Sequence, residues 1–242
     1  MFIKQFGLER SGTNVVKSLV EFNFGMRVYS NFPLHKHKHA LPFNRFLIGD
    51  KEVYELERLG ISISEFERIK QDVSSGHMLF IFSIRDVGSW VEGYYRYMKK
   101  RKKIENLNHE FVVDSLHRWK SINSTYMNFN EINPSKSIIV KHTDVVAGDR
   151  RWLEDIKKRL QDSDVSVVSD DVVSSVEGYA KMGTDLHRGM DAIGGDINFD
   201  RDKYASSYWV DELPGWAVQF ILKWSEDISS HDRRFLNYIS PA

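Results

Sequence analysis

The segment Met78–Ile84, which reads Met-Leu-Phe-Ile-Phe-Ser-Ile, constrains the fold more than any other part of the chain. Successive side chains of a β-strand point to opposite faces of a sheet, so a strand that is apolar on both faces must be covered on both. Such strands are typical of the centre of a parallel sheet. Helical periodicity follows over residues 88–102 and is also present over residues 50–72 and 109–127. A strand followed by a helix recurs over residues 1–21 and over residues 137–160, where the strand covers 137–141. We therefore expect one α/β domain over residues 1–242, with a central parallel sheet between two layers of helices.

The composition excludes several classes of protein. Lys+Arg and Asp+Glu each number 34 in the 242 residues, so the net charge is zero, which argues against a nucleic acid partner. The absence of cysteine excludes disulfides, thiolate metal sites and a cysteine nucleophile. No stretch is apolar enough to span a membrane, and the first residues lack the pattern of a secretion signal. We expect a cytoplasmic protein without a membrane span.

A turn with the spacing of a phosphate-binding loop follows the first strand. It reads Gly7-Leu-Glu-Arg-Ser-Gly-Thr-Asn, with the glycine spacing G-x-x-x-x-G. Glycines let such a turn aim several N–H groups at one anion, and the next helix adds the positive end of its dipole. The ATP- and GTP-binding loop has a lysine and then a hydroxyl residue after the second glycine, where this chain has Thr13 and Asn14. The alternative is a tight strand–helix turn without a ligand.

The sequence Arg10-Ser11-Gly12-Thr13-Asn14 after a first strand resembles the 5′-phosphosulfate loop of sulfotransferases that use 3′-phosphoadenosine 5′-phosphosulfate (PAPS). The resemblance implies a P-loop-type α/β/α fold with PAPS as the sulfuryl donor. It also implies that Arg10 contacts the 5′-phosphate and the leaving oxygen. The backbone and hydroxyl donors implied beside it are Ser11, Gly12, Thr13 and Asn14.

Residues 84–97 are similar to a second segment of that family, which binds the 3′-phosphate through an arginine and a serine. The arginine corresponds to Arg85, at the carboxyl end of the central strand, where open α/β sheets bind ligands. Val87 replaces the family's proline, and Gly93 replaces its serine. Loss of that hydroxyl would cost on the order of 1–3 kcal/mol, and we expect Ser89, one helical turn earlier on the same face, to substitute. The alternative for Arg85 is a surface ion pair with Asp86 or with another neighbour.

Residues 138–146 are similar to a third segment, which is mainly architectural in the family. His142 and Thr143 replace its tyrosine and glutamate, whereas Asp144 matches. Together the three segments cover residues 2–160 in the family's order.

The candidate chemistry lies in the run His35-Lys-His-Lys-His39. Sulfuryl transfer needs a base for the proton of the acceptor hydroxyl and positive charge at the leaving phosphate oxygen. Histidine titrates near neutral pH and suits the first role. Two alternatives stay open: three alternating imidazoles could converge on zinc, or the run could be a solvated loop. The expected base is His37 or His39, with Glu9 as a lesser candidate, and the cations expected to assist Arg10 are Lys36 and Lys38.

Two further patterns have ordinary structural explanations. Residues 96–103 hold six basic side chains in eight positions, which is typical of a solvated helix end. The alternative is contact with the nucleotide or with an acidic acceptor. The aromatic residues of the carboxyl-terminal third fall at helical spacing and are typical of a core, although exposed members could stack on an acceptor ring.

With the family resemblance, these residues predict a sulfotransferase that moves the sulfuryl group of PAPS to a hydroxyl of a carbohydrate or glycolipid acceptor, without a required metal. A rival hypothesis is a P-loop kinase of a small molecule or sugar, which would need a magnesium site. A third is a degenerate nucleotide-binding module without catalysis, and Gly93 is its main support.

Overall fold

The computed structural model describes residues 1–32, 36–37, 56, 59–163, 165, 172 and 207–239. Within these residues, a sheet of parallel strands runs in the order β2-β1-β3-β4. The strands are β1 (Phe2–Gly7), β2 (Val28–Tyr29), β3 (Met78–Ile84) and β4 (Ser137–Lys141). The expectation of a central parallel strand at Met78–Ile84 is confirmed, since β3 pairs with a parallel strand on each side.

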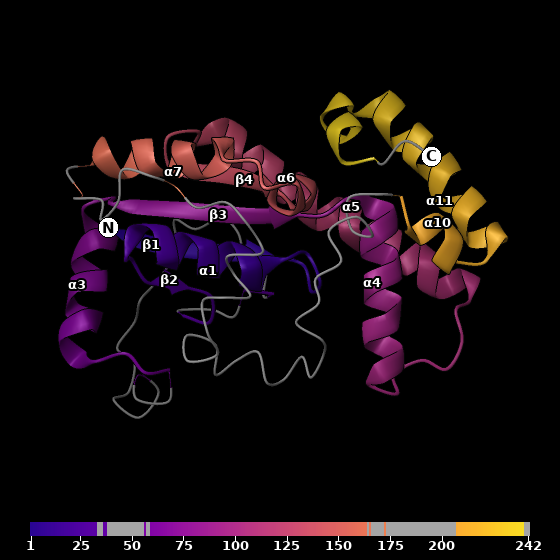
Figure 1. Ribbon diagram of the computed structural model, residues 1–242, viewed down its shortest axis with the longest axis horizontal. Helices are drawn as coiled ribbons and strands as arrows, with labels where there is room; N and C mark the ends of the chain where they lie inside the picture. Colours follow the sequence, from indigo (N-terminus) through magenta and orange to yellow (C-terminus); the bar gives the residue numbers. More distant parts are fainter. Residues whose placement is uncertain are drawn as a thin grey trace.

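The helices follow the strands in the expected alternation (Figure 1). Those of the first half are α1 (Thr13–Phe24), α3 (Ile63–Ser74), α4 (Val87–Lys100) and α5 (His109–Ile132). Those of the second half are α6 (His142–Ala147), α7 (Arg151–Gln161), α10 (Trp209–Glu212), α11 (Gly215–His231) and the 3₁₀ helix η4 (Arg233–Tyr238).

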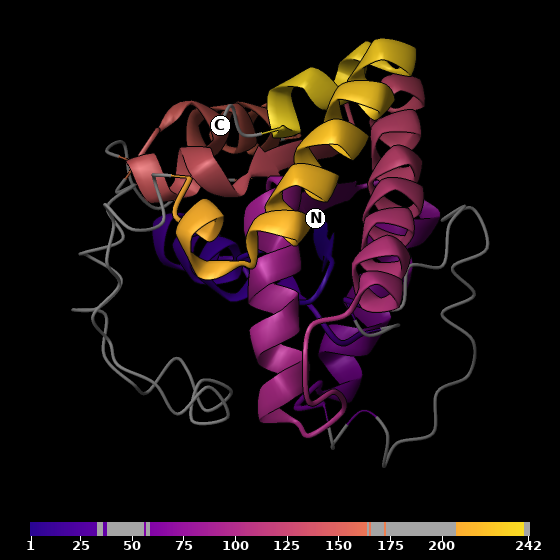
Figure 2. The same ribbon diagram turned by 90° about the vertical axis from the view of Figure 1, so that its right-hand side faces the viewer.

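Both faces of the sheet are buried, as the apolar pattern of β3 requires. Leu79 and Ile81 pack with α1 and α7 on one face, whereas Phe80 and Phe82 pack with α4, α5 and α11 on the other. Figure 2 shows α4, α5 and α11 side by side, and the contacts between these helices agree. The protein is therefore an α/β structure with an all-parallel central sheet between helices.

The strand order locates the part of the sheet best suited to a ligand. The chain passes from β1 to β2 on one side and then returns to β3 on the other side of β1. In open α/β sheets, ligands bind beyond the carboxyl ends of the strands at the point where the order reverses. Gly7 and Ser83, near the ends of β1 and β3, are register partners at that point. Figure 1 shows α4, α10 and α11 at this end of the sheet, beyond the arrowhead of β3.

The carboxyl-terminal segment is fastened to the start of α4. A Cβ added to Gly88 would lie 2.1–2.5 Å from atoms of the Trp209 indole, so this close approach requires glycine. Trp209 itself is 1% exposed. Within the described residues, none of the helices combines the length and apolar character needed to cross a bilayer.

Candidate anion-binding site

The loop between β1 and α1 turns twice through the left-handed region of backbone conformation. Arg10 has φ 68° and Gly12 has φ 78°, and only glycine adopts this conformation without strain. A Cβ on Gly7 would lie 2.6 Å from Ser11 Oγ and from Thr13 Cγ2, so the start of the loop also needs glycine. The N–H groups of the first turn of α1 have no carbonyl partners within the helix, so the loop presents them at the positive end of the helix dipole.

Buried polar contacts hold this loop on the sheet. Gln5 Nε2 donates to the Thr13 carbonyl at 2.8 Å and to Ser83 Oγ at 3.2 Å. The Ser11 hydroxyl donates to the Leu8 carbonyl at 2.7 Å, inside the loop. The predicted ligand donor Ser11 therefore holds the turn with its hydroxyl proton, and its backbone N–H is directed to the same carbonyl at 3.2 Å.

Arg85 directly follows β3 and reaches the loop, and it is only 4% exposed. Its Nη1 donates to the Arg10 carbonyl at 3.1 Å, and its Nη2 donates to the Tyr208 hydroxyl at 2.6 Å. The alternative of a surface ion pair with Asp86 is not what the structure shows. Asp86 caps α4 instead, because its carboxylate accepts from the Ser89 N–H at 2.8 Å.

Gly93 faces the two arginines. A Cβ at this position would lie 3.0 Å from Arg85 Nη1 and 3.7 Å from Arg10 Cβ. The position that corresponds to the family's serine therefore adjoins both proposed phosphate-binding residues. We expect Ser89 to substitute for that serine. It is 3% exposed, and its backbone N–H donates to the Asp86 carboxylate.

A buried relay connects the loop to the carboxyl-terminal segment. The Tyr208 hydroxyl accepts from Arg85 and donates to Glu92 Oε2 at 2.8 Å. Glu92 is 1% exposed and forms an ion pair with Arg96 one turn further along α4. Because each buried charge has an oppositely charged or polar partner, the relay fixes Arg85 without leaving an isolated ion in the core.

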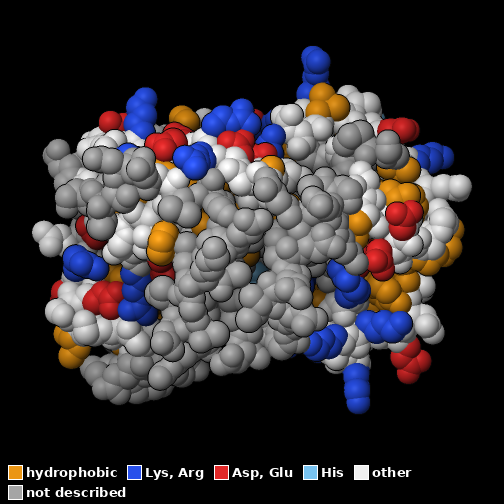
Figure 3. Space-filling model, in the orientation of Figure 1, with side chains coloured by type: hydrophobic (Ala, Val, Ile, Leu, Met, Phe, Trp, Pro, Cys, Tyr) orange, Lys and Arg blue, Asp and Glu red, His pale blue; other side chains and the backbone are white. Residues whose placement is uncertain are grey.

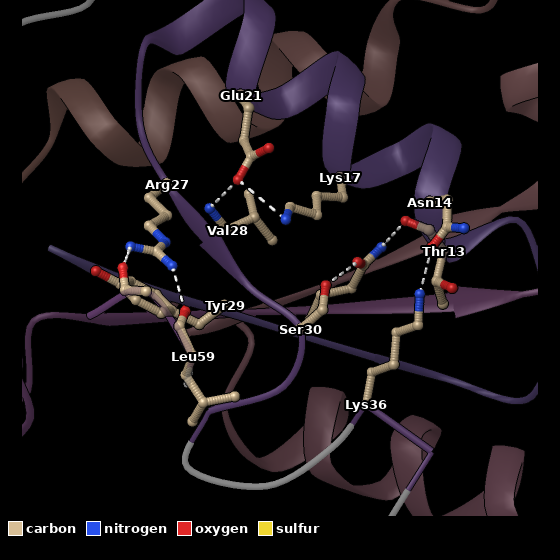
Figure 4. Close-up of polar contacts among 12 residues, drawn as sticks. Thr13, Asn14, Lys17, Glu21, Arg27, Val28, Tyr29, Ser30, Lys36 and Leu59 are labelled. Atoms are coloured by element: carbon tan, nitrogen blue, oxygen red, sulfur yellow. Dashed lines mark hydrogen bonds and ion pairs between the residues drawn. The ribbon is translucent and has the colours of Figure 1, made fainter. Parts of the chain in front are cut away.

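Lys36 approaches the first turn of α1 from outside the loop (Figure 4). Its ammonium donates to Asn14 Oδ1. Burial and the nearby charge of Lys17 lower the pKa of Lys36 to about 8. Burial and Lys36 in turn lower the pKa of Lys4, whose Nζ donates to the Ser30 carbonyl at 3.1 Å. Positive charge is thus concentrated at the start of α1, where an anionic ligand would offset the repulsion.

His37 lies against the carbonyl end of β1. Its Nδ1 is 2.6 Å from the Gly7 carbonyl oxygen, which can only accept, so Nδ1 carries the proton. In the neutral imidazole the basic lone pair is then on Nε2. Glu9, the lesser candidate, is engaged by Arg118 Nη2 at 2.6 Å. Burial raises the pKa of Glu9, but a backbone hydrogen bond, Arg118 and His37 outweigh it and hold that pKa below its usual range.

His142 lies beneath the loop. A Cβ on Gly12 would meet His142 Cδ2 at 2.7 Å, a second reason for glycine at that position. The imidazole Nδ1 is buried. Burial and the positive charges of Arg85 and Arg10 lower the pKa of His142 well below its usual value, so the ring is neutral at neutral pH.

Several predicted residues cannot be placed. His35, Lys38 and His39 lie outside the described residues, so the zinc alternative for the histidine run and the choice between His37 and His39 both stay open. Across the described ranges, no three histidine, aspartate or glutamate side chains gather as a metal site would require.

Sequence reasoning missed the relay and the position of His142. Tyr208 is one of the aromatic residues of the carboxyl-terminal third that the sequence predicts as core, yet its hydroxyl bonds to Arg85, which is 123 positions away. A weak signal exists, because Glu92 on the inner face of α4 needs a buried partner. The chain matches no protein-family model and no curated protein.

Proposed function

We propose that the chain transfers the sulfuryl group of PAPS to a hydroxyl of a carbohydrate or glycolipid acceptor and releases adenosine 3′,5′-bisphosphate. The observation that carries the proposal is the juxtaposition of Arg85 with Arg10 and Gly93 at the carboxyl ends of β1 and β3. Two arginines beside a helix N-terminus suit a ligand with two separate phosphoryl groups. The proposal includes a P-loop-type fold, in which Gly7–Asn14 is the phosphate loop.

The reaction would be an in-line displacement at sulfur. The acceptor oxygen forms a bond to sulfur while the bond from sulfur to the phosphate oxygen breaks, and negative charge develops on that oxygen. Cations close to the oxygen stabilise this charge. Arg10 in the loop and Lys36 at the start of α1 are the described cations that could supply it. The bisphosphate leaves with both electrons of the broken bond, and the acceptor proton passes to a base.

His37 is the base that the described residues favour. Because its Nδ1–H is directed to the Gly7 carbonyl, Nε2 is the nitrogen that could accept the acceptor proton. His39 stays an equal alternative by sequence. In His37→Ala and His39→Ala variants, we expect one to lose turnover with little change in affinity for the bisphosphate. If both variants keep turnover, a histidine base is excluded.

A kinase is the second candidate, and Lys36 favours it. The loop has no lysine of its own at Thr13, but Lys36 brings an ammonium to Asn14 from another segment. Such a lysine could contact the outer phosphates of a nucleoside triphosphate. The two functions differ in their donor, since the kinase needs magnesium and ATP whereas the sulfotransferase needs PAPS.

Release of adenosine 3′,5′-bisphosphate from PAPS, measured with carbohydrate and glycolipid acceptors, tests the proposal. Arg10→Gln should lower the rate by about 100-fold or more, the usual loss on removing a group that stabilises developing charge. Arg85→Gln removes the cation expected at the 3′-phosphate and should weaken the binding of PAPS. The matched control is Arg27→Gln, because Arg27 forms an ion pair with Glu65 of α3 and lies at the opposite end of α1 from Asn14 (Figure 4). A full rate in Arg10→Gln would contradict the assignment of the loop.

A further inference from the structure

A ladder of aromatic rings leads from the loop along α4. The Trp90 indole donates to the Glu9 carbonyl at 2.7 Å, so the ladder begins at the loop. Tyr94 stacks on Trp90 with ring centroids 5.0 Å apart, and Tyr97 continues the stack at 6.4 Å. Phe111 of α5 stacks on Tyr94 at 5.6 Å. Beyond Trp90 the rings are partly exposed, and the Arg118 guanidinium lies 5.2 Å from the centroid of the Tyr94 ring, so a ligand would meet aromatic rings and positive charge together.

The far end of the ladder is strongly basic. Lys99, Lys100 and Arg101 are exposed there, and residues 102–103 continue the basic run. The Arg101 guanidinium lies 4.8 Å from the centroid of the Tyr97 ring, so the basic end adjoins the ladder directly. Figure 3 shows Lys and Arg side chains around the lower end of α4.

An exposed aromatic wall lies on α5 and α11, and α11 contacts α4. The His109 ring lies 4.7 Å from Phe220 and 6.2 Å from Trp216, measured between ring centroids. Trp216, on the first turn of α11, is 42% exposed, which is high for so large an apolar side chain. Hydrophobic side chains gather over this flank of the molecule in Figure 3.

We propose that this surface binds the acceptor and that the acceptor is an anionic oligosaccharide. We call it the α4 track and define it by the ladder, the basic residues 99–103 and the wall of His109, Trp216 and Phe220. The proposal rests on the proposed function, which needs a hydroxyl-bearing molecule at the loop. The flat C–H face of a sugar ring could pack on the exposed Trp216 ring, and carboxylate or sulfate groups of the sugar would pair with the lysines and arginines.

The length of the track favours a chain over a single sugar. From Trp90 to Arg101 the helix rises about 16 Å, at 1.5 Å per residue. Only an extended ligand would contact the basic end while its hydroxyl reaches the loop. Single-stranded nucleic acid also combines stacking with charge, but the zero net charge of the chain disfavours it. A membrane surface is less suited, because the rings of the ladder lie along the side of α4, half-buried against α5.

Binding of alginate oligosaccharides to the wild-type chain without PAPS, measured by calorimetry at low salt, tests the proposal. The Lys100→Gln/Arg101→Gln double variant should bind at least about tenfold more weakly, and Trp216→Ala about three- to tenfold more weakly. The matched control Lys136→Gln/Arg150→Gln removes two exposed cations elsewhere and should bind within about twofold of wild type. Melting temperatures establish that each variant folds.

Parallel titrations identify other occupants and separate the two proposals. Equal binding of neutral dextran, or tighter binding of oligo(dT) or of phosphatidylserine vesicles, would overturn the assignment to an anionic oligosaccharide. If the variants of the α4 track bind alginate as tightly as wild type, the track is not the binding site. Adenosine 3′,5′-bisphosphate should bind the track variants as it binds wild type, because the substituted residues lie away from the loop. If alginate binding requires the residues of the α4 track but the bisphosphate binds no form of the protein, the sulfotransferase proposal is wrong. The assignment of the α4 track as a binding surface would then still hold.

Discussion

Tyr208→Phe tests the relay behind the loop. The substitution keeps the ring and removes only the hydroxyl, which bonds to Arg85 at 2.6 Å and to Glu92 at 2.8 Å. Hydrogen bonds to buried charged groups are each worth about 1.5–3 kcal/mol. Arg85 keeps its bond to the Arg10 carbonyl and Glu92 keeps its ion pair with Arg96, so we take the low end of the sum. The expected loss is about 3 kcal/mol in the free energy of unfolding, and melting falls by roughly 6–12 °C.

Thermal melts followed by circular dichroism measure this loss, with Tyr97→Phe as the matched control. The ring at position 97 is partly exposed and keeps its contact with Arg101, so the melting temperature of the Tyr97→Phe protein should change by less than about 2 °C. Tyr208→Phe should also weaken binding of adenosine 3′,5′-bisphosphate, because Arg85 loses one of its tethers. Combining it with Glu92→Gln should cost less than the sum of the two single changes. If Tyr208→Phe has the same melting temperature as wild type, the relay does not stabilise the fold as proposed.

Two other perturbations test the site and the fold. Burial and Lys17 lower the pKa of Lys36 to about 8, so the affinity for the bisphosphate should fall as pH rises through this value. Lys36→Arg keeps its charge at this pH, and calorimetric titrations should show no such fall in its affinity. If the affinity of wild type for the bisphosphate does not change with pH, the assignment of Lys36 is wrong. In the unfolded chain Lys36 keeps its proton up to its usual pKa, so this residue makes the free energy of unfolding rise with pH from about 8 toward 10.5. Gly88→Ala should lower the free energy of unfolding by about 2 kcal/mol, because the new methyl group meets the indole of Trp209. Gly215→Ala has open space within 4 Å in the described chain and should melt at or above wild type; equal melting of the two variants would refute the predicted clash.

The sheet and most helices could be predicted because their signals are local. The run Met78–Ile84 is apolar on both faces, and β3 spans those residues with helices on both sides. The strand expected over 137–141 is found at those bounds, and the helix expected over 109–127 continues to Ile132. The helical pattern over residues 50–72 is confirmed only in part, because α3 begins at Ile63 and the described residues 59–62 before it are not helical.

The site was only partly predictable, because its partners are far apart in sequence. The loop glycines and Arg85 carry local signatures, whereas Lys36 reaches Asn14 across 22 positions and Tyr208 reaches Arg85 across 123. The sequence also suggested that Gly93 weakens the site by removing a hydroxyl. The structure adds that a larger residue there would press on Arg85, a packing effect that only coordinates reveal.

Thermal shift with adenosine 3′,5′-bisphosphate, compared with magnesium and ATP, tests the central claim most directly. A ligand at about 100 times its dissociation constant stabilises the native state by roughly 2.7 kcal/mol. For a chain of this size, that raises the melting temperature by about 5–11 °C. We expect this shift with the bisphosphate and its loss in Arg85→Gln. A shift with magnesium and ATP alone, or with neither ligand, would contradict the proposed function.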